Sequence, residues 1–201
     1  KGDLLIYVGN KTGIEGVGGA SMASNVFSQD KKLDKSTVQK ADAFLERLLL
    51  EACIEISERQ LATGMQDMGA GGILCSTFEV VKRGNKKYGG NLGCEIELSK
   101  VPTKQDMNDY EILASESQER MLIVSNLENR DLIFEIFEKW DLEYAVIGTV
   151  TDDGNYTVLN NGVRVFTKDM EEFDKVENQD WPEKVNHIDD MIPIKVKNRD
   201  L

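Results

Sequence analysis

The stretch DAFLERLLLEACIEISERQ, residues 42–60, predicts the longest helix of the chain and, through it, a layered fold. Its apolar residues recur at positions i, i+1, i+4 and i+5, which trace one face of a helix with 3.6 residues per turn. They are Phe44, Leu45, Leu48, Leu49, Ala52, Cys53 and Ile56. Asp42 directly precedes this face and is a typical N-cap residue. A helix with one apolar face has to pack on an apolar surface, and the simplest such surface is a sheet.

Short apolar runs on both sides of this helix predict the strands of that sheet. Residues 3–8 form a buried strand between glycines, and residues 94–98 alternate apolar and acidic side chains. Further strands are expected at 121–124, 144–150, 156–159 and 163–166, the last three as a meander whose Asn160-Asn161-Gly162 turn is a hairpin signal. Further helices are expected at 73–82, 107–114 and 127–140, with two helical turns at 20–27 and a flexible turn at 84–93. We therefore predict an α+β fold, a mixed β-sheet covered by helices.

Length and charge limit the classes of protein that the chain can represent. Its 201 residues predict one domain at 1–168, followed by a charged strap or linker at 169–201 that leads towards a further domain. Because the chain begins with Lys1, we expect it to be a piece of a longer polypeptide. A net charge of −12 argues against a nucleic-acid surface, and the longest apolar run, five residues, is far too short to span a membrane.

The three cysteines form no CxxC pair and no zinc-ligand spacing. They therefore indicate reduced thiols in a cytoplasmic protein, at apolar positions where a structural role is more common than a nucleophilic one. The single histidine, His187, lies in the charged tail, so histidine-based acid–base catalysis is not expected around the glycine loops. The basic residues Lys82, Arg83, Lys86 and Lys87 are most simply solvated charges.

Two glycine-rich loops and one polar run carry the candidate chemistry. The loop at 9–24 has five glycines and the hydroxyls of Thr12, Ser21 and Ser24. It predicts either a phosphate cradle at a helix start or a tight strand-to-helix connection, and it is not a P-loop. In the loop at 66–72, Asp67 ends a short strand and would either hold Mg²⁺ or cap the following helix. The run at 115–120 offers carboxylate, hydroxyl and amide groups that suit a ribose or an amidine, although such a run is usually a solvated loop.

In sequence order these segments resemble phosphoribosylformylglycinamidine synthase, in particular the first C-terminal-type domain of its small bacterial-type subunit. The segments are GDLLIYVGNKTGIEGVGGASMAS (2–24), VQ (38–39), FLERLLLEAC (44–53), GMQDMGAGGILCS (64–76) and SESQERML (115–122). The resemblance covers residues 2 to about 165, and the SESQERM run is its most specific part. It implies a fold similar to the C-terminal domain of aminoimidazole ribonucleotide synthetase.

The resemblance implies a function for the parent protein and roles for five residues. That family is an ATP-dependent ligase of purine biosynthesis, which converts formylglycinamide ribonucleotide and ammonia from glutamine into formylglycinamidine ribonucleotide. The matching positions imply that Gln39, Glu116, Ser117 and Gln118 bind the substrate and that Asp67 binds Mg²⁺. Most ATP contacts and the catalytic histidines of the family belong to segments outside this chain, which we therefore expect to be inactive alone. The implied partners are a glutaminase and small accessory subunits, and the resemblance is compatible with a homodimer.

The chain departs from the family pattern at two places. The family usually has TGRDG where this chain has Thr12-Gly13-Ile14-Glu15-Gly16, and Gly-Asp-Pro where it has Ala41-Asp42-Ala43. Two other functions stay open on the sequence: another member of the same ATP-using superfamily, of the aminoimidazole ribonucleotide or selenophosphate synthetase type, and a non-catalytic binding module. The departures favour the module, whereas the intact QDMGAGG and SESQER runs favour the ligase.

Overall fold

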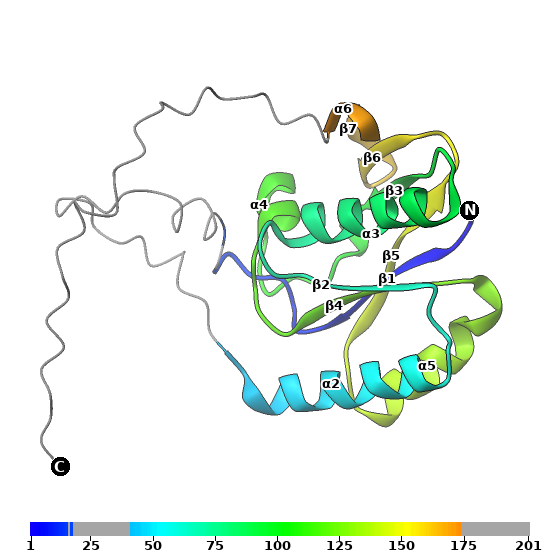
Figure 1. Ribbon diagram of the computed structural model, residues 1–201. Helices are drawn as coiled ribbons and strands as arrows, with labels where there is room; N and C mark the ends of the chain where they lie inside the picture. Colours follow the sequence, from blue (N-terminus) through cyan, green and yellow to red (C-terminus); the bar gives the residue numbers. More distant parts are fainter. Residues whose placement is uncertain (16, 18–40, 174–201) are drawn as a thin grey trace, which may run out of the picture.

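The computed structural model describes residues 1–15, 17 and 41–173, and it contains one seven-stranded sheet with helices on both faces (Figure 1). The strands are β1 (Leu4–Gly9), β2 (Gly64–Asp67), β3 (Gly93–Glu97), β4 (Arg120–Ser125), β5 (Tyr144–Thr151), β6 (Asn155–Asn160) and β7 (Val163–Asp169). The α-helices are α2 (Ala43–Glu58), α3 (Gly72–Tyr88), α4 (Asp109–Ala114), α5 (Arg130–Lys139) and α6 (Met170–Phe173), and short 3₁₀ turns are η2 (Leu98–Lys100) and η3 (Leu127–Asn129). The predicted α+β class is confirmed.

The central strands of the sheet are buried on both faces, which explains the unbroken apolar sequence of β1. Leu5 and Tyr7 of β1 belong to the core beneath α3 and α4, whereas Ile6 and Val8 belong to the core above α2 and α5. Figure 1 shows these two helix pairs on opposite sides of the sheet. Successive strand residues point to opposite faces, so a strand covered on both sides needs apolar residues at every position.

The helix predicted at 42–60 forms as α2 and is capped as expected. The Asp42 carboxylate accepts hydrogen bonds from the backbone N–H of Phe44 (3.1 Å) and of Leu45 (3.0 Å). Leu49, Ala52 and Ile56 are buried against the sheet.

Two apolar residues of the predicted helices are exposed. The side chain of Phe44, predicted on the apolar face at 42–60, is 76% exposed, because it lies about 110° round the helix from the centre of the face formed by the buried residues of α2. Leu132, in the helix expected at 127–140, is 37% exposed for the same reason, since it lies about 90° from the buried Ile133, Ile136 and Phe137.

The prediction of a flexible turn at 84–93 is wrong in its first half. The turn expected from residue 84 does not begin there, because α3 continues through Gly84 to Tyr88 and ends at Gly89. The side chain of Asn85 then holds the following loop by hydrogen bonds to Leu92 N (2.7 Å) and Leu92 O (3.0 Å). The apolar side chains that α3 buries hold it in place despite its internal glycine.

The predicted meander of three strands is correct only for β6 and β7. The strand order is β2-β4-β1-β5-β3-β6-β7, so β3 lies between β5 and β6, antiparallel to the first and parallel to the second. β6 and β7 do form a hairpin, and its turn residues Asn161 and Gly162 both have positive φ, as an Asn-Gly turn requires.

The hydrophobic core continues beyond residue 165, where the family resemblance ends, into α6. Met170 is only 6% exposed, and the ring of Phe173 lies 5.1 Å from that of Phe78 and 5.5 Å from that of Tyr156. The division of the chain at 168/169 stays a prediction, and most of 169–201 lies outside the described residues. So do the helical turns predicted at 20–27. Within 1–15, 17 and 41–173, no helix is long and apolar enough to cross a bilayer.

Candidate functional site

The two glycine loops and the polar run meet at one end of the sheet. β4 runs antiparallel to its neighbours β2 and β1, so that Arg120 at its start pairs with Gly9 at the end of β1. In the same way Asp67, which ends β2 as predicted, pairs with Met121. Segments that are far apart in the sequence therefore enter and leave the sheet side by side.

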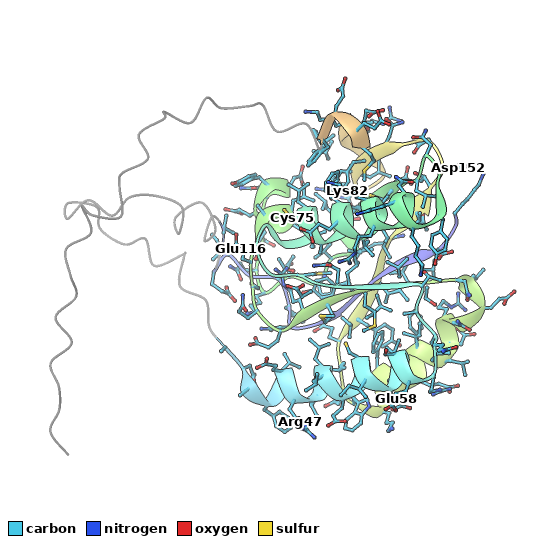
Figure 2. All side chains as sticks on the ribbon, viewed as in Figure 1. Arg47, Glu58, Cys75, Lys82, Glu116 and Asp152 are labelled. Carbon is cyan, nitrogen blue, oxygen red and sulfur yellow. The ribbon has the colours of Figure 1, made fainter. Side chains whose placement is uncertain are left out.

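The polar run before β4 is buried and joins the two loops. Ser117 Oγ accepts a hydrogen bond from Gly13 N (3.0 Å), and Ser115 Oγ donates one to Gly13 O (2.6 Å). Glu116, only 4% exposed, accepts a hydrogen bond from Gly71 N (3.2 Å) just before α3. Figure 2 shows Glu116 at this end of the molecule, beside the start of α3, and Asp152 at the opposite end. The run is thus not the solvated loop that polar residues at a strand entrance usually form.

Arg120 is the other buried polar residue that holds this region together. It is 3% exposed, and its guanidinium donates to Ser117 O (2.6 Å), Thr12 Oγ1 (3.0 Å), Met68 O (3.3 Å) and Ser115 O. Burial lowers the pKa of this guanidinium, while the nearby Tyr7, Glu15 and Glu116 raise it. The side chain remains a cation, because arginine loses its proton only above pH 12.

A cleft of about 590 Å³ opens beside these segments, between the first half of α2 and the ends of β2 and β4. It is lined by Ala41, Ala43, Glu46, Arg47, Leu49, Leu50, Cys53, Asp67, Met68, Gly69, Gln118, Glu119, Arg120 and Met121. The start of α2 is fixed to the polar run, since Glu119 Oε1 accepts from Asp42 N (3.0 Å). Polar groups from three elements therefore face one concave surface, as small-molecule sites require.

The cleft separates the predicted site residues into two groups. Asp67 and Gln118 line it, whereas Glu116 and Ser117 are buried behind it and hold the glycine loops. Gln118 also donates to Glu116 O (2.9 Å), which fixes the orientation of its amide. Gln39 lies outside the described residues. Asp67 and the polar run are thus at the same end of the sheet, and the roles assigned to these five residues stay predictions.

The surroundings of Asp67 suit a hard cation that keeps most of its bound water molecules. Its carboxylate is exposed and accepts from Gln66 Nε2 (2.9 Å). Among the described residues no group of three or more acidic, histidine or cysteine side chains is arranged to hold a metal. Mg²⁺ commonly binds through one or two carboxylates and completes its shell with water and substrate phosphates, so a single carboxylate at the cleft fits it.

Sequence reasoning missed Arg120 and the contribution of the start of α2. Arg120 had a usable signal, because it is a charged residue at the first position of the apolar strand β4 and has to find buried acceptors there. The side chains of Glu46 and Arg47 gave no such signal, since charges in the first turns of a helix are ordinarily solvated. The departure Ile14 is an exposed side chain, and the departure Glu15 forms an ion pair with Lys104.

The three cysteines are free, as predicted, and none has the lowered pKa of a nucleophile. Burial raises the pKa of Cys53 to about 11 and that of Cys94 to about 12. Burial also raises the pKa of Cys75, with smaller contributions from Glu79 and Glu116. These thiols are structural at neutral pH.

A mixed sheet whose loops converge on a buried polar run and a cleft defines an α+β domain with a candidate small-molecule site. Residues 1–160 match the family described as AIR synthase related protein, C-terminal domain, and the chain belongs to that family.

Similar proteins share one name. The chain is 44% identical over 163 residues to phosphoribosylformylglycinamidine synthase subunit PurL of Granulibacter bethesdensis, which is 81% of this chain and 22% of that protein. It is 39% identical over 197 residues to the subunit of the same name from Caldanaerobacter subterraneus, 94% of this chain and 26% of that protein. The chain thus spans about a quarter or less of the length of these relatives.

Solved structures of one further protein have the same fold. The structure of T. maritima PurL complexed with FGAR matches with a TM-score of 0.80 at 36% identity, over 89% of this chain and 29% of that one. The structures of T. maritima PurL complexed with ATP and of PurLQS from Thermotoga maritima match with TM-scores of 0.69 and 0.70, each at 33% identity over 85% of this chain and 25% of that one. The expected resemblance in sequence and fold is confirmed.

Proposed function

We propose that this chain is the part of an ATP-dependent phosphoribosylformylglycinamidine synthase that binds the ribonucleotide substrate. The parent protein would convert formylglycinamide ribonucleotide and ammonia into formylglycinamidine ribonucleotide. The names of the relatives and the FGAR complex of T. maritima PurL support this reaction. The observation that carries it is the convergence of residues 67–69 and 118–121 on one cleft.

The described residues would bind and orient the substrate. The Gln118 amide, fixed by its bond to Glu116 O, presents polar atoms to hydroxyl or amide groups in the cleft. The buried positive charge of Arg120 and the N-terminal end of α2 both favour a phosphorylated ligand there. Glu116 and Ser117 would act mainly by holding the loops around it.

Asp67 is the described residue that would hold Mg²⁺, which would neutralise phosphate charge at the cleft. The ATP of the reaction, which activates the amide oxygen of the substrate, would be bound mostly by other parts of the parent protein. The described residues include no histidine, and we propose that the chain alone binds substrate without turnover.

The partners of the parent would be a glutaminase and small accessory subunits, and the existence of a PurLQS structure from T. maritima supports partner subunits of this kind. A homodimer is compatible with this assignment, and the cytoplasm is the proposed location because the cysteines are unpaired. The acidic composition gives no support for a nucleic-acid partner.

The substitution Asp67→Asn in the full-length synthase tests the metal assignment. It keeps the size of the side chain and removes its charge, so we expect at least tenfold more Mg²⁺ to be needed for half-maximal activity and a similar loss of Mn²⁺ affinity by titration. The matched control is Asp131→Asn, because Asp131 is an exposed carboxylate on α5 that does not line the cleft. Equal metal dependence in both variants and the wild type would refute the role of Asp67.

A further inference from the structure

We propose that Arg120 is a positioning residue, which sets the spacing of the three segments around the cleft without itself contacting the ligand. This inference rests on the proposed function only for the identity of the ligand. It follows from the hydrogen bonds of one side chain, which reach every segment that carries a predicted site residue in the described part of the chain.

The acceptors of Arg120 come from separate parts of the sequence. Thr12 belongs to the loop after β1, Met68 follows Asp67 in the loop after β2, and Ser115 and Ser117 flank Glu116. A guanidinium is planar and presents its donors in a fixed fork, so it fixes the relative positions of its acceptors better than a flexible ammonium does. The distance between the Asp67 loop and the 115–118 run is therefore set through this group.

The donors of Arg120 are fully used inside the protein. A guanidinium has five N–H groups. Four of them reach the acceptors named above, and the Tyr7 hydroxyl is a further hydrogen-bond partner. Tyr7 is itself fixed, since its hydroxyl donates to Asn10 O. With no N–H left over, Arg120 cannot bind a ligand directly, although it lines the cleft.

The charge of Arg120 has a second consequence for the cleft. The acceptors of its hydrogen bonds are neutral oxygens, so these bonds satisfy the donors, while the nearby carboxylates of Glu15 and Glu116 offset part of the charge. In a region shielded from water such charges act over a longer range than surface charges do. Loss of the guanidinium would therefore change the electrostatics of the cleft as well as its geometry.

The experiment compares Arg120→Lys, which keeps the charge but loses the fork, with Arg83→Lys. Arg83 is a matched control because it also donates to a carbonyl of β2, Met65 O (3.1 Å), but is exposed and does not line the cleft. The first readout is backbone amide exchange at Gly13 and Gly71, whose N–H groups bind Ser117 and Glu116. The second is the affinity of the chain for formylglycinamide ribonucleotide by calorimetry.

We expect Arg120→Lys to speed exchange at Gly13 and Gly71 at least tenfold while the amide of Ile6, in the centre of the sheet, changes less than twofold. We also expect substrate affinity to fall at least tenfold, and Arg83→Lys to stay within twofold of wild type in both readouts. Unchanged exchange at the two glycines, or equal acceleration at Ile6, would overturn the positioning role. Faster exchange at Gly13 and Gly71 in Arg120→Lys with unchanged substrate affinity would also overturn it, provided that the wild-type chain binds the substrate.

Two further outcomes are covered by the same design. If the wild-type chain does not bind the ribonucleotide, the proposed function fails, and the exchange readout alone decides whether Arg120 positions the loops. If Arg120→Lys does not fold, Thr12→Val replaces it, because this nearly isosteric change removes a single acceptor of the guanidinium. Exchange at Gly13 should then rise at least threefold, and an unchanged rate would overturn the proposal.

Discussion

Replacing Gly72 by alanine should destabilise the domain more than the same change at a glycine with open surroundings. Gly72 is the first residue of α3 and has a φ of +55°. A Cβ atom there would lie 2.1 Å from Ser115 O and 2.9 Å from Leu113 O, both of them backbone atoms at the end of α4. Backbone cannot rotate away as a flexible side chain does, so α3 or the 114–116 segment has to move.

The magnitude has two parts. An alanine in the left-handed region costs about 1 kcal/mol, and forcing an extra carbon into a closely packed contact costs about 2 kcal/mol more. A loss of about 3 kcal/mol corresponds to a fall of about 6–12 °C in the melting temperature of a domain of this size. The displaced atoms adjoin Glu116, so substrate affinity should fall as well.

Gly162→Ala separates the two parts. Gly162 lies in the turn between β6 and β7 with a φ of +74°, and a Cβ atom there would have no neighbour within 4 Å. This variant should therefore lose about 1 kcal/mol, the backbone cost alone. Urea unfolding followed by circular dichroism measures both variants. Equal losses in the two would show that the contact of Gly72 with Ser115 imposes no constraint.

Two other predictions concern the end of the domain and its thiols. Met170→Ala should lower the free energy of unfolding in urea by about 2–3 kcal/mol, because Met170 is buried. Glu171 is exposed, so Glu171→Ala should change it by less than about 0.5 kcal/mol. Equal effects of the two substitutions would mean that the core ends before residue 169. At pH 8 the thiols of Cys53 and Cys94, with pKa values of about 11 and 12, should react with iodoacetamide at least about a hundredfold more slowly in the native chain than in urea, where an unfolded thiol has a pKa of about 8.5. Since these pKa values are raised on folding, the thiols also make the free energy of unfolding fall as the pH rises above about 8.5 towards 11–12. Native labelling as fast as labelling in urea would contradict the burial of the thiols. A free energy of unfolding that rises over this pH range would contradict it as well.

The sequence predicted the elements well where burial imposes a strict pattern. β1 and β4 are covered on both faces, so their apolar runs are continuous, and α2 is covered on one face, so its apolar residues follow the helical period. The errors arose at the margins of such patterns. Phe44 and Leu132 lie beside the apolar faces of their helices, and hydrophobicity alone does not show where the covering layer ends.

Topology and the site were less predictable, because they depend on contacts between distant segments. The insertion of β3 between β5 and β6 pairs residue 94 with residues 150 and 156, and no local pattern encodes that choice. Asp67 was correctly placed at the end of a strand. By contrast, the burial of Glu116 and Ser117 could not be predicted, since their partners Gly71 and Gly13 are 45 and 104 residues away.

The placement of the 115–120 run changes how its chemistry should be interpreted. A run that only bound substrate would expose its side chains, yet Ser115, Glu116, Ser117 and Arg120 are all buried and bonded to the protein. Of the residues 115–120, Gln118, Glu119 and Arg120 line the cleft. Buried polar groups that are fully bonded specify one arrangement of their neighbours, because any other arrangement leaves donors or acceptors unpaired. The run therefore acts first as the framework of the cleft, and a substitution within it has to be tested for loop order before a loss of binding is assigned to a lost ligand contact.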